Sequence, residues 1–247
     1  QTMSIPNTVT IIGEYAFSEC ENLESINIPY GVTEIGEYAF YECSLESIDI
    51  PNSVTEIGGY AFHSNNFTTL EIPNSIVEIA DSAFNRCNLL TSVTIPNSVI
   101  TIGWEAFAYC RNLKDLTIGN SVTTIEQGAF GSCDALESLT LPESLTTIGD
   151  EAFFGCNNIP SITIPKNVTS IGDEAFFVGK SNSRQTIYCM GTTPPTIGSY
   201  TFGAYNSNYY PVKGSYPIYV PKESVETYKN APTWSGLADR IKAAIDY

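Results

Sequence analysis

The dipeptide Ala-Phe recurs along this chain at an almost constant spacing. Successive copies lie 23, 22, 22, 23, 23, 23 and 23 residues apart, and a degenerate copy, Thr201-Phe202, follows after 26 more. The repeated phenylalanines are Phe17, Phe40, Phe62, Phe84, Phe107, Phe130, Phe153 and Phe176. One unit of this size cannot bury its own apolar side, but stacked copies can. The period therefore predicts a repeat solenoid, a single elongated domain of about nine coils over residues 1–221.

Each unit contains two short extended segments. Leu23-x-x-Ile26-x-Ile28 and its copies alternate apolar with polar residues, which predicts a β-strand with one buried face. Copies are expected at Leu45–Ile50, Leu90–Ile95 and Leu136–Leu141. The proline that follows, such as Pro29, lacks a backbone donor and ends the ladder. A second segment then ends in glycine, where the chain can turn.

Acidic residues precede Ala-Phe in most units: Glu14, Glu37, Asp81, Asp150 and Asp173. They suit the start of a single helical or 3₁₀ turn, where free N–H groups favour a carboxylate. A calcium site is the alternative, but no Asp-x-Asp-x-Asp spacing occurs.

Six of the seven cysteines lie three residues after a repeat phenylalanine: Cys20, Cys43, Cys87, Cys110, Cys133 and Cys156. Stacked coils align these thiols as a ladder whose side chains point the same way. Buried reduced cysteine is also a common small core residue. We therefore expect structural, reduced thiols, and the same for Cys189 at an inward strand position.

The pattern loosens after residue 180. Residues 203–215 are rich in Gly, Asn and Tyr and predict a loop. From Lys222 to Tyr247 the apolar residues take mostly helical spacing: Val225, Tyr228, Trp234, Leu237, Ile241 and Ile245. Two short amphipathic helices are expected here as a C-terminal cap, residues 222–247, on the last coil. No comparable cap precedes Ile5, so the first coil is expected to lie at a truncation or against something outside this sequence.

The charge balance restricts the partners. Eleven Lys and Arg against 27 Asp and Glu give a net charge of −16, which disfavours phosphate backbones and anionic membranes. No apolar run reaches the roughly 20 residues that span a bilayer. No signal peptide opens the chain, so any signal or anchor is expected outside it.

Catalytic chemistry has little support. The single histidine, His63, lies in a turn and has no recurring Cys, Asp or Ser partner. No nucleophile elbow, zinc-protease motif, P-loop or dinucleotide motif occurs. The repeat spreads the carboxylates along the chain, so no pair stands out. We expect no enzyme activity, no cofactor and no metal, and name no catalytic residues.

Residues between the buried strand positions face outward on the predicted sheet. The central outward row is the candidate ligand face: Asn27, Asp49, Glu71, Thr94, Thr117, Thr140, Thr163, Tyr188 and Tyr219. A neighbouring row is mostly serine: Ser25, Ser47, Thr69, Ser92, Asp115, Ser138 and Ser161. Threonine also suits an exposed strand without any ligand. Solenoids nevertheless often bind through this face.

The motifs Leu-x-x-Ile-x-Ile-Pro and Val-Thr-x-Ile-Gly-x-x-Ala-Phe-x-x-Cys resemble those of the BspA-like, or treponemal-type, leucine-rich repeats. The match is strong over residues 4 to about 180, and Cys189–Ile197 and Ile218–Pro221 resemble closing repeats. The resemblance implies a leucine-rich-repeat right-handed superhelix, mainly parallel β with short helical or 3₁₀ turns. It also implies a bacterial secreted or surface-anchored protein that adheres to host or bacterial proteins, with no shared catalytic site.

Three binding hypotheses remain. The first is a monomeric extracellular or cell-surface protein that binds host, matrix or bacterial surface proteins through the sheet face. The second is a glycan-binding module using Tyr188, Tyr219 and the tyrosines between Tyr205 and Tyr216. The third is ice or mineral binding by the threonine row, which needs a long, flat Thr-x-Thr array; here one outward row is mostly serine.

Overall fold

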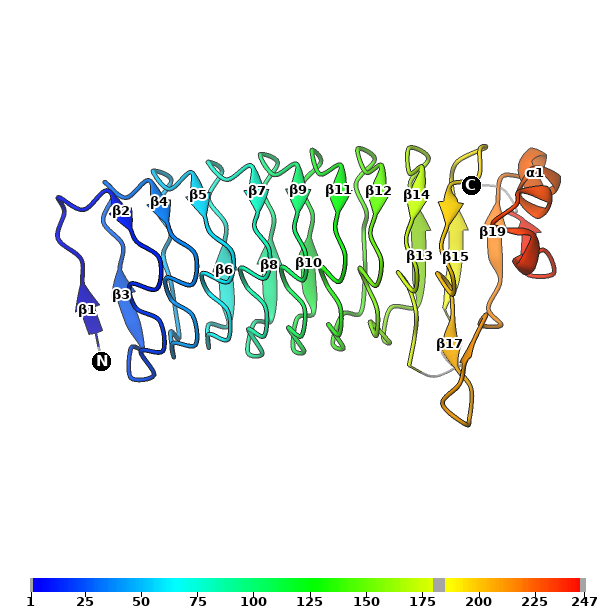
Figure 1. The fold of residues 1–247 in the computed structure, drawn as a ribbon. Coiled ribbons are helices and arrows are strands. Elements are labelled where there is room, and N and C mark those ends of the chain that lie inside the picture. The colour runs from blue at the N-terminus through cyan, green and yellow to red at the C-terminus, as the bar shows by residue number, and fades with distance from the viewer. Residues whose placement is uncertain (1, 180–184, 245–247) are drawn as a thin grey trace.

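The computed structural model describes residues 2–179 and 185–244, which form a parallel β-solenoid. The coils stack side by side from the N-terminus to a helical cap at the other end, so the molecule is elongated (Figure 1). Two rows of parallel strands run along the stack, and turns connect them. The predicted solenoid is confirmed.

Strands of three or four residues form what we call the long-strand row. They pair in parallel in three groups: β1 (Thr2–Ser4) and β3 (Ser25–Asn27); β6 (Thr69–Glu71), β8 (Ser92–Thr94) and β10 (Asp115–Thr117); β13 (Ser161–Ile164), β15 (Thr186–Cys189), β19 (Ile218–Val220) and β20 (Ile241–Ala243). Equivalent repeat positions lie opposite each other, as Leu70, Val93 and Leu116 do.

The long-strand row is interrupted in two coils where strands were expected. Residues 47–49 and 138–140 form no strand, although Ile50 and Leu139 remain buried. The first of these coils has one residue fewer between Cys43 and Leu45 than its neighbour has between Cys20 and Leu23. The shorter connection changes how the chain enters the long-strand row. In this coil the strand pairing is reduced to backbone hydrogen bonds such as the one from Glu46 N–H to Glu24 O, 2.9 Å.

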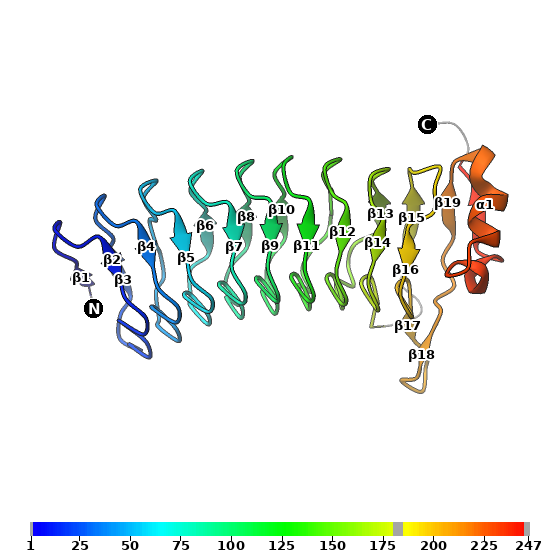
Figure 2. The same ribbon diagram turned by 45° about the horizontal axis from the view of Figure 1, so that its top comes forward.

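Two-residue strands form the short-strand row on the other side of the coils (Figure 2). They pair in parallel in two groups: β2 (Ile11–Ile12), β4 (Glu34–Ile35) and β5 (Glu56–Ile57); β7 (Glu78–Ile79), β9 (Thr101–Ile102), β11 (Thr124–Ile125), β12 (Thr147–Ile148), β14 (Ser170–Ile171) and β16 (Thr196–Ile197). Their isoleucines lie in register, so each inward side chain packs on the next.

Glycine follows this strand for a reason other than the expected turn. A Cβ on Gly36 would lie 2.7 Å from Glu14 N, and one on Gly149 would lie 2.6 Å from Gln127 N. Neither glycine has a positive φ. The residue is therefore small because two coils approach closely.

The Ala-Phe segment is a run of turns rather than a continuous helical turn. The amides of Tyr15, Phe17 and Glu19 donate to carbonyls of the next coil, at 2.7–3.0 Å. The intervening amides bond within the coil, as Ser18 N–H does to Tyr15 O at 3.1 Å. Tyr15 and Glu19 have φ of 54° and 59°, and this left-handed conformation interrupts a helix. Alternate amides thereby hold adjacent coils together.

The repeat phenylalanines form one continuous stack through the core. Phe107 lies between Phe84 and Phe130, with ring centroids 5.3 and 5.4 Å apart. Rings from Phe40 to Phe176 are fully or almost fully buried. Because each ring contacts the ring of the next coil, the number of residues between successive phenylalanines can vary little.

The C-terminal cap differs from the two predicted helices. It contains one short α-helix, α1 (Val225–Asn230), between 3₁₀ turns η1 (Lys222–Ser224) and η2 (Ser235–Leu237). Ile241 belongs instead to β20, which pairs in parallel with β19. Without β20 this side of β19 would present unpaired backbone groups, and pairing satisfies them. Ile245 lies outside the described residues.

Residues 203–215, expected to form a loop, contain an antiparallel hairpin of β17 (Ala204–Tyr205) and β18 (Pro211–Val212). Buried Arg240 ties this hairpin to the cap. Its Nε donates to Tyr216 O at 2.9 Å, one amino group donates to Phe202 O and Lys213 O, and its guanidinium lies 4.6 Å from the Tyr216 ring centroid. Sequence reasoning missed Arg240, because its partners are backbone carbonyls distant in the chain.

Candidate functional site

The structure places the predicted outward row along the long-strand row. Its first seven members, Asn27 to Thr163, are exposed, and Tyr188 and Tyr219 are half-buried. Strand pairing aligns Glu71, Thr94 and Thr117, and separately Thr163, Tyr188 and Tyr219. Asp49 and Thr140 fall in the two coils without a strand.

Four members of this row border a depression of about 1020 Å³, which we call the sheet-edge groove. It lies at the carboxyl ends of β6, β8 and β10 and continues over the next coil. Its outward-row members are Glu71, Thr94, Thr117 and Thr140. Ile72, Ile95, Ile118 and Leu141 also line it, together with half-buried Leu116. The groove therefore combines hydroxyl groups with apolar surface.

The other side of the groove comes from the turns after the strands, which sequence reasoning did not assign to the site. Asn74, Asn97, Asn120 and Glu143 line it. Asn97 Oδ1 accepts the Asn120 N–H at 2.7 Å, which fixes one turn against the next. The residue after the strand proline, or after Gly119 in its place, was the available signal, since parallel strands place these turns at one edge.

Gly119 occupies the middle of the groove, where most units have proline. A Cβ there would lie 2.4 Å from Pro96 O, closer than backbone contacts allow. This coil therefore approaches its neighbour more closely than a proline would permit.

Carboxylates flank the groove. Glu71 and Glu143 line it in its first and last coils, and exposed Asp115 lies in β10 beside it. Among the residues that the structure describes, no lysine, arginine or histidine lines the groove. Hydroxyl and amide groups between two carboxylates suit a ligand that donates hydrogen bonds and carries positive charge.

Tyr188 and Tyr219 stack on each other, with ring centroids 5.4 Å apart and planes 18° apart. The other tyrosines of the proposed cluster differ from one another in burial. Tyr209 and Tyr210, between β17 and β18, are exposed, whereas Tyr216 is buried and its hydroxyl donates to Gly203 O. Burial thus removes Tyr216 from the exposed tyrosines of the expected cluster.

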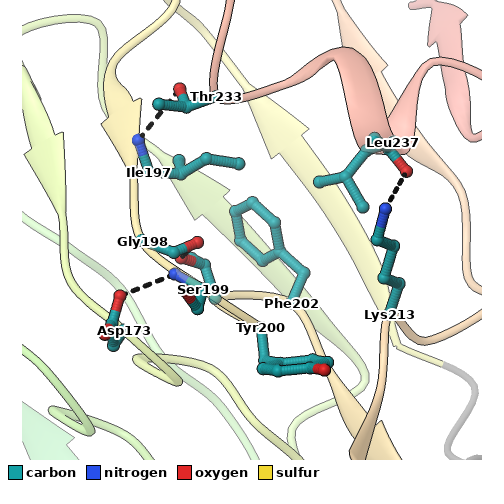
Figure 3. Close-up of a pocket in the computed structure, with 11 residues that line it drawn as sticks. Asp173, Ile197, Gly198, Ser199, Tyr200, Phe202, Lys213, Thr233 and Leu237 are labelled. Atoms are coloured by element: carbon teal, nitrogen blue, oxygen red, sulfur yellow. Dashed lines mark hydrogen bonds between the residues drawn. The ribbon is translucent and has the colours of Figure 1, made fainter.

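A second depression, of about 330 Å³, lies between the last Ala-Phe-type turn and the cap (Figure 3). Its polar groups are engaged locally. Asp173 accepts the Ser199 N–H at 2.6 Å, Thr233 Oγ1 accepts the Ile197 N–H at 3.3 Å, and Lys213 Nζ donates to Gly236 O at 3.2 Å. The first bond joins two coils, and the bonds of Thr233 and Gly236 hold the cap on the solenoid.

His63 lies in a turn, as expected, and is buried there. Its ring stacks on Tyr41 with centroids 4.8 Å apart. Burial, followed by the nearby positive charge of Arg86, lowers the pKa of His63. Stacking and burial make it a packing residue.

The thiol ladder is confirmed as free cysteines. All seven are buried except Cys20, which is half-buried. Each thiol from Cys87 to Cys156 donates to the carbonyl of a phenylalanine 25 or 26 residues earlier, at 3.3 Å. Burial raises the pKa of Cys43 to about 11 and of Cys87 and Cys156 to about 12.

The model of the BspA type leucine rich repeat region matches residues 1–91 and 78–209. The chain belongs to this family. A leucine-rich repeat protein from Bacteroides ovatus ATCC 8483 is 31% identical to this BspA-type chain, with a TM-score of 0.72 over 89% of this chain and 55% of that one. No curated protein matches the sequence significantly.

Two further solved structures share the fold of the BspA-type chain. A leucine-rich repeat protein from Eubacterium ventriosum ATCC 27560 is 24% identical, with a TM-score of 0.53 over 78% of this chain and 62% of that one. The pneumococcal vaccine antigen PcpA is 20% identical, with a TM-score of 0.55 over 100% of this chain and 67% of that one. The BspA-type chain thus spans little more than half the length of the B. ovatus protein. Among the described residues, no helix is long and apolar enough to cross a membrane.

Proposed function

We propose that this chain is a non-enzymatic interaction module of a bacterial extracellular or cell-surface protein, and that it binds a protein partner through the sheet-edge groove. The observation that carries the proposal is the groove itself, about 1020 Å³, which the outward row borders across four coils. The BspA-type family supports the surface location, and the repeated placement of the carboxylates supports a binding role rather than acid-base catalysis.

The lining of the groove suits an extended segment of the partner protein that carries hydrogen-bond donors and positive charge. Its threonine and asparagine side chains provide hydrogen-bonding groups at regular intervals along the stack. Glu71 and Glu143 add negative charge in its first and last coils, and the net charge of −16 attracts basic partners. The apolar lining lets the partner bury side chains as well.

The experiment is a pull-down with panels of host extracellular and bacterial surface proteins, followed by affinity measurements on the captured partner. Thr94→Arg with Thr117→Arg places bulk and positive charge in the groove, and we expect at least a tenfold loss of affinity. Val77→Arg with Ile100→Arg is the matched control, because both positions are exposed and neither lines the groove. Equal losses in both variants would contradict binding through the groove.

Glycan binding by Tyr188 and Tyr219 is the second candidate. The equivalent position is threonine in the four preceding coils, so the repeat does not require an aromatic ring there. Replacing both tyrosines with threonine separates the roles. Lost binding on a glycan array with an unchanged melting temperature would support a site, whereas lost stability alone would identify a packing pair.

A further inference from the structure

Two arginines of this acidic chain meet in a small depression away from the sheet-edge groove. Arg86 and Arg111 come from consecutive coils and line a volume of about 400 Å³ with Tyr109, Asn88 and Asn112. This depression lies before β8 and β10, whereas the groove lies at their carboxyl ends. The two surfaces share no lining residue.

The repeat does not require arginine at either position. Arg86 lies two residues after its repeat phenylalanine, where the other coils from Phe17 to Phe153 have Glu19, Glu42, Ser64, Tyr109, Ser132 and Gly155. Arg111 lies four residues after, where they have Glu21, Ser44, Asn66, Asn88, Asp134 and Asn157. Among these coils, arginine at these two positions is therefore particular to two consecutive coils.

The side chain of Arg86 packs on a ring of the next coil, and both arginines keep side-chain N–H groups for a ligand. The Arg86 guanidinium lies 4.9 Å from the Tyr109 ring centroid, which uses its flat face and leaves its N–H groups in the plane. Neither arginine forms an ion pair with any residue in the described ranges, and both side chains are exposed. A planar carboxylate matches such guanidinium donors.

The amides complete the depression with neutral hydrogen-bonding groups. Asn112 Nδ2 donates to Asn88 O at 2.7 Å, which orders the turn and leaves the Asn112 carbonyl oxygen as an acceptor. The exposed Asn88 side chain adds further donors and an acceptor. Amides beside a carboxylate site suit hydroxyl groups next to the anionic group of a ligand.

The charges around the depression limit how much negative charge the ligand can carry. On one side, Asp134 occupies the position of Arg111 in the next coil. On the other side, the carboxylate of Glu42 lies near enough to His63 to raise its pKa, and Arg86 acts on the same ring. A polyanion that extends over several coils would pass over such carboxylates and be repelled. A ligand with one compact charge and an otherwise neutral, hydroxylated body avoids this repulsion.

We propose that Arg86, Tyr109 and Arg111, with Asn88 and Asn112, form a binding site for one carboxylated sugar unit, such as a sialic or uronic acid residue. The arginines bind the carboxylate and the amides bind neighbouring hydroxyls. This site is independent of the proposed protein binding through the sheet-edge groove.

The test titrates the protein, near physiological salt, with methyl glycosides of N-acetylneuraminic acid and glucuronic acid. Their neutral methyl esters, inorganic sulfate and a sulfated polysaccharide are titrated in parallel, and binding is followed by nuclear magnetic resonance shifts. We expect saturable binding of at least one acidic glycoside and at least tenfold weaker binding of its ester. Arg86→Gln with Arg111→Gln should weaken acidic glycoside binding at least tenfold without changing the melting temperature.

Lys166→Gln with Lys222→Gln is the matched control, because it removes the same charge from exposed positions outside the depression. It should bind the acidic glycoside as the unaltered protein does. The proposal is overturned if no acidic glycoside binds, if ester and acid bind equally, or if the control loses as much affinity. Binding of sulfate alone, or tighter binding of the polysaccharide through the same arginines, would also overturn it.

Discussion

At the scale of single residues, the repeat phenylalanine links each coil to both neighbours. Phe107 is fully buried and stacks on Phe84 and Phe130. Phe107→Ala should destabilise the protein by about 3–5 kcal/mol, since it leaves a cavity and removes both ring contacts. Thermal and urea unfolding measure this change. Val77→Ala, at an exposed position, is the control and should change stability little. An unchanged midpoint for Phe107→Ala would contradict the packing described.

The thiols make a second residue-scale prediction. Burial raises the pKa of Cys87 and Cys156 to about 12 and raises that of Cys110 and Cys133. An acid with a raised folded-state pKa stabilises the fold below its unfolded pKa, near 9, and loses this contribution as pH rises toward 12. At pH 8 a thiol reagent should modify half-buried Cys20 first and all seven cysteines only after unfolding without reductant. Fast modification of Cys110 in the folded protein would contradict this.

At the scale of elements, acidic residues before Ala-Phe join one coil to the next. Asp150 Oδ1 accepts the Asp173 N–H at 2.8 Å, and Asp81 does the same for Trp104. Asp150→Ala should cost about 1 kcal/mol because that amide loses its acceptor. Asp150→Asn keeps an oxygen and should recover most of the loss in chemical unfolding. Glu151→Gln removes the same charge without breaking this bond, so a comparable loss there would point to charge alone.

At the scale of the whole molecule, stacking aligns like charges along the solenoid. Burial, followed by Asp81 and Glu78, raises the pKa of Glu126; burial, followed by Glu151 and Asp173, raises that of Glu174. A carboxyl with a raised folded-state pKa stabilises the fold below its unfolded pKa, near 4.5, and loses this as pH rises through the folded value. The melting temperature should therefore rise as pH falls from 7 toward 5, and Glu126→Gln should reduce the slope. A steady fall over this range would contradict the prediction.

How much of the fold the repeat predicts depends on which contacts a residue makes. Positions that contact their own copies in adjacent coils could be assigned from the spacing alone. Phe107, Cys110 and Ile102 are buried as expected, and Thr94 and Thr117 face outward. A period of 22–23 residues brings equivalent positions of adjacent coils together, independently of the detailed conformation of the turns.

Contacts between unlike positions were decided by the tertiary structure. Arg86 and Arg111 come from different repeat positions and line one depression, and the groove joins strand residues such as Thr117 to turn residues such as Asn97, because particular turns bring them together. Sequence alone determined the solenoid, its buried rows and its outward face, since alternation and period act within and between equivalent positions. The groove and the arginine pair depend on the conformations of particular turns, which no local pattern contains. The pairing of β20 with β19 depends on the terminal segment reaching the unpaired backbone groups of β19.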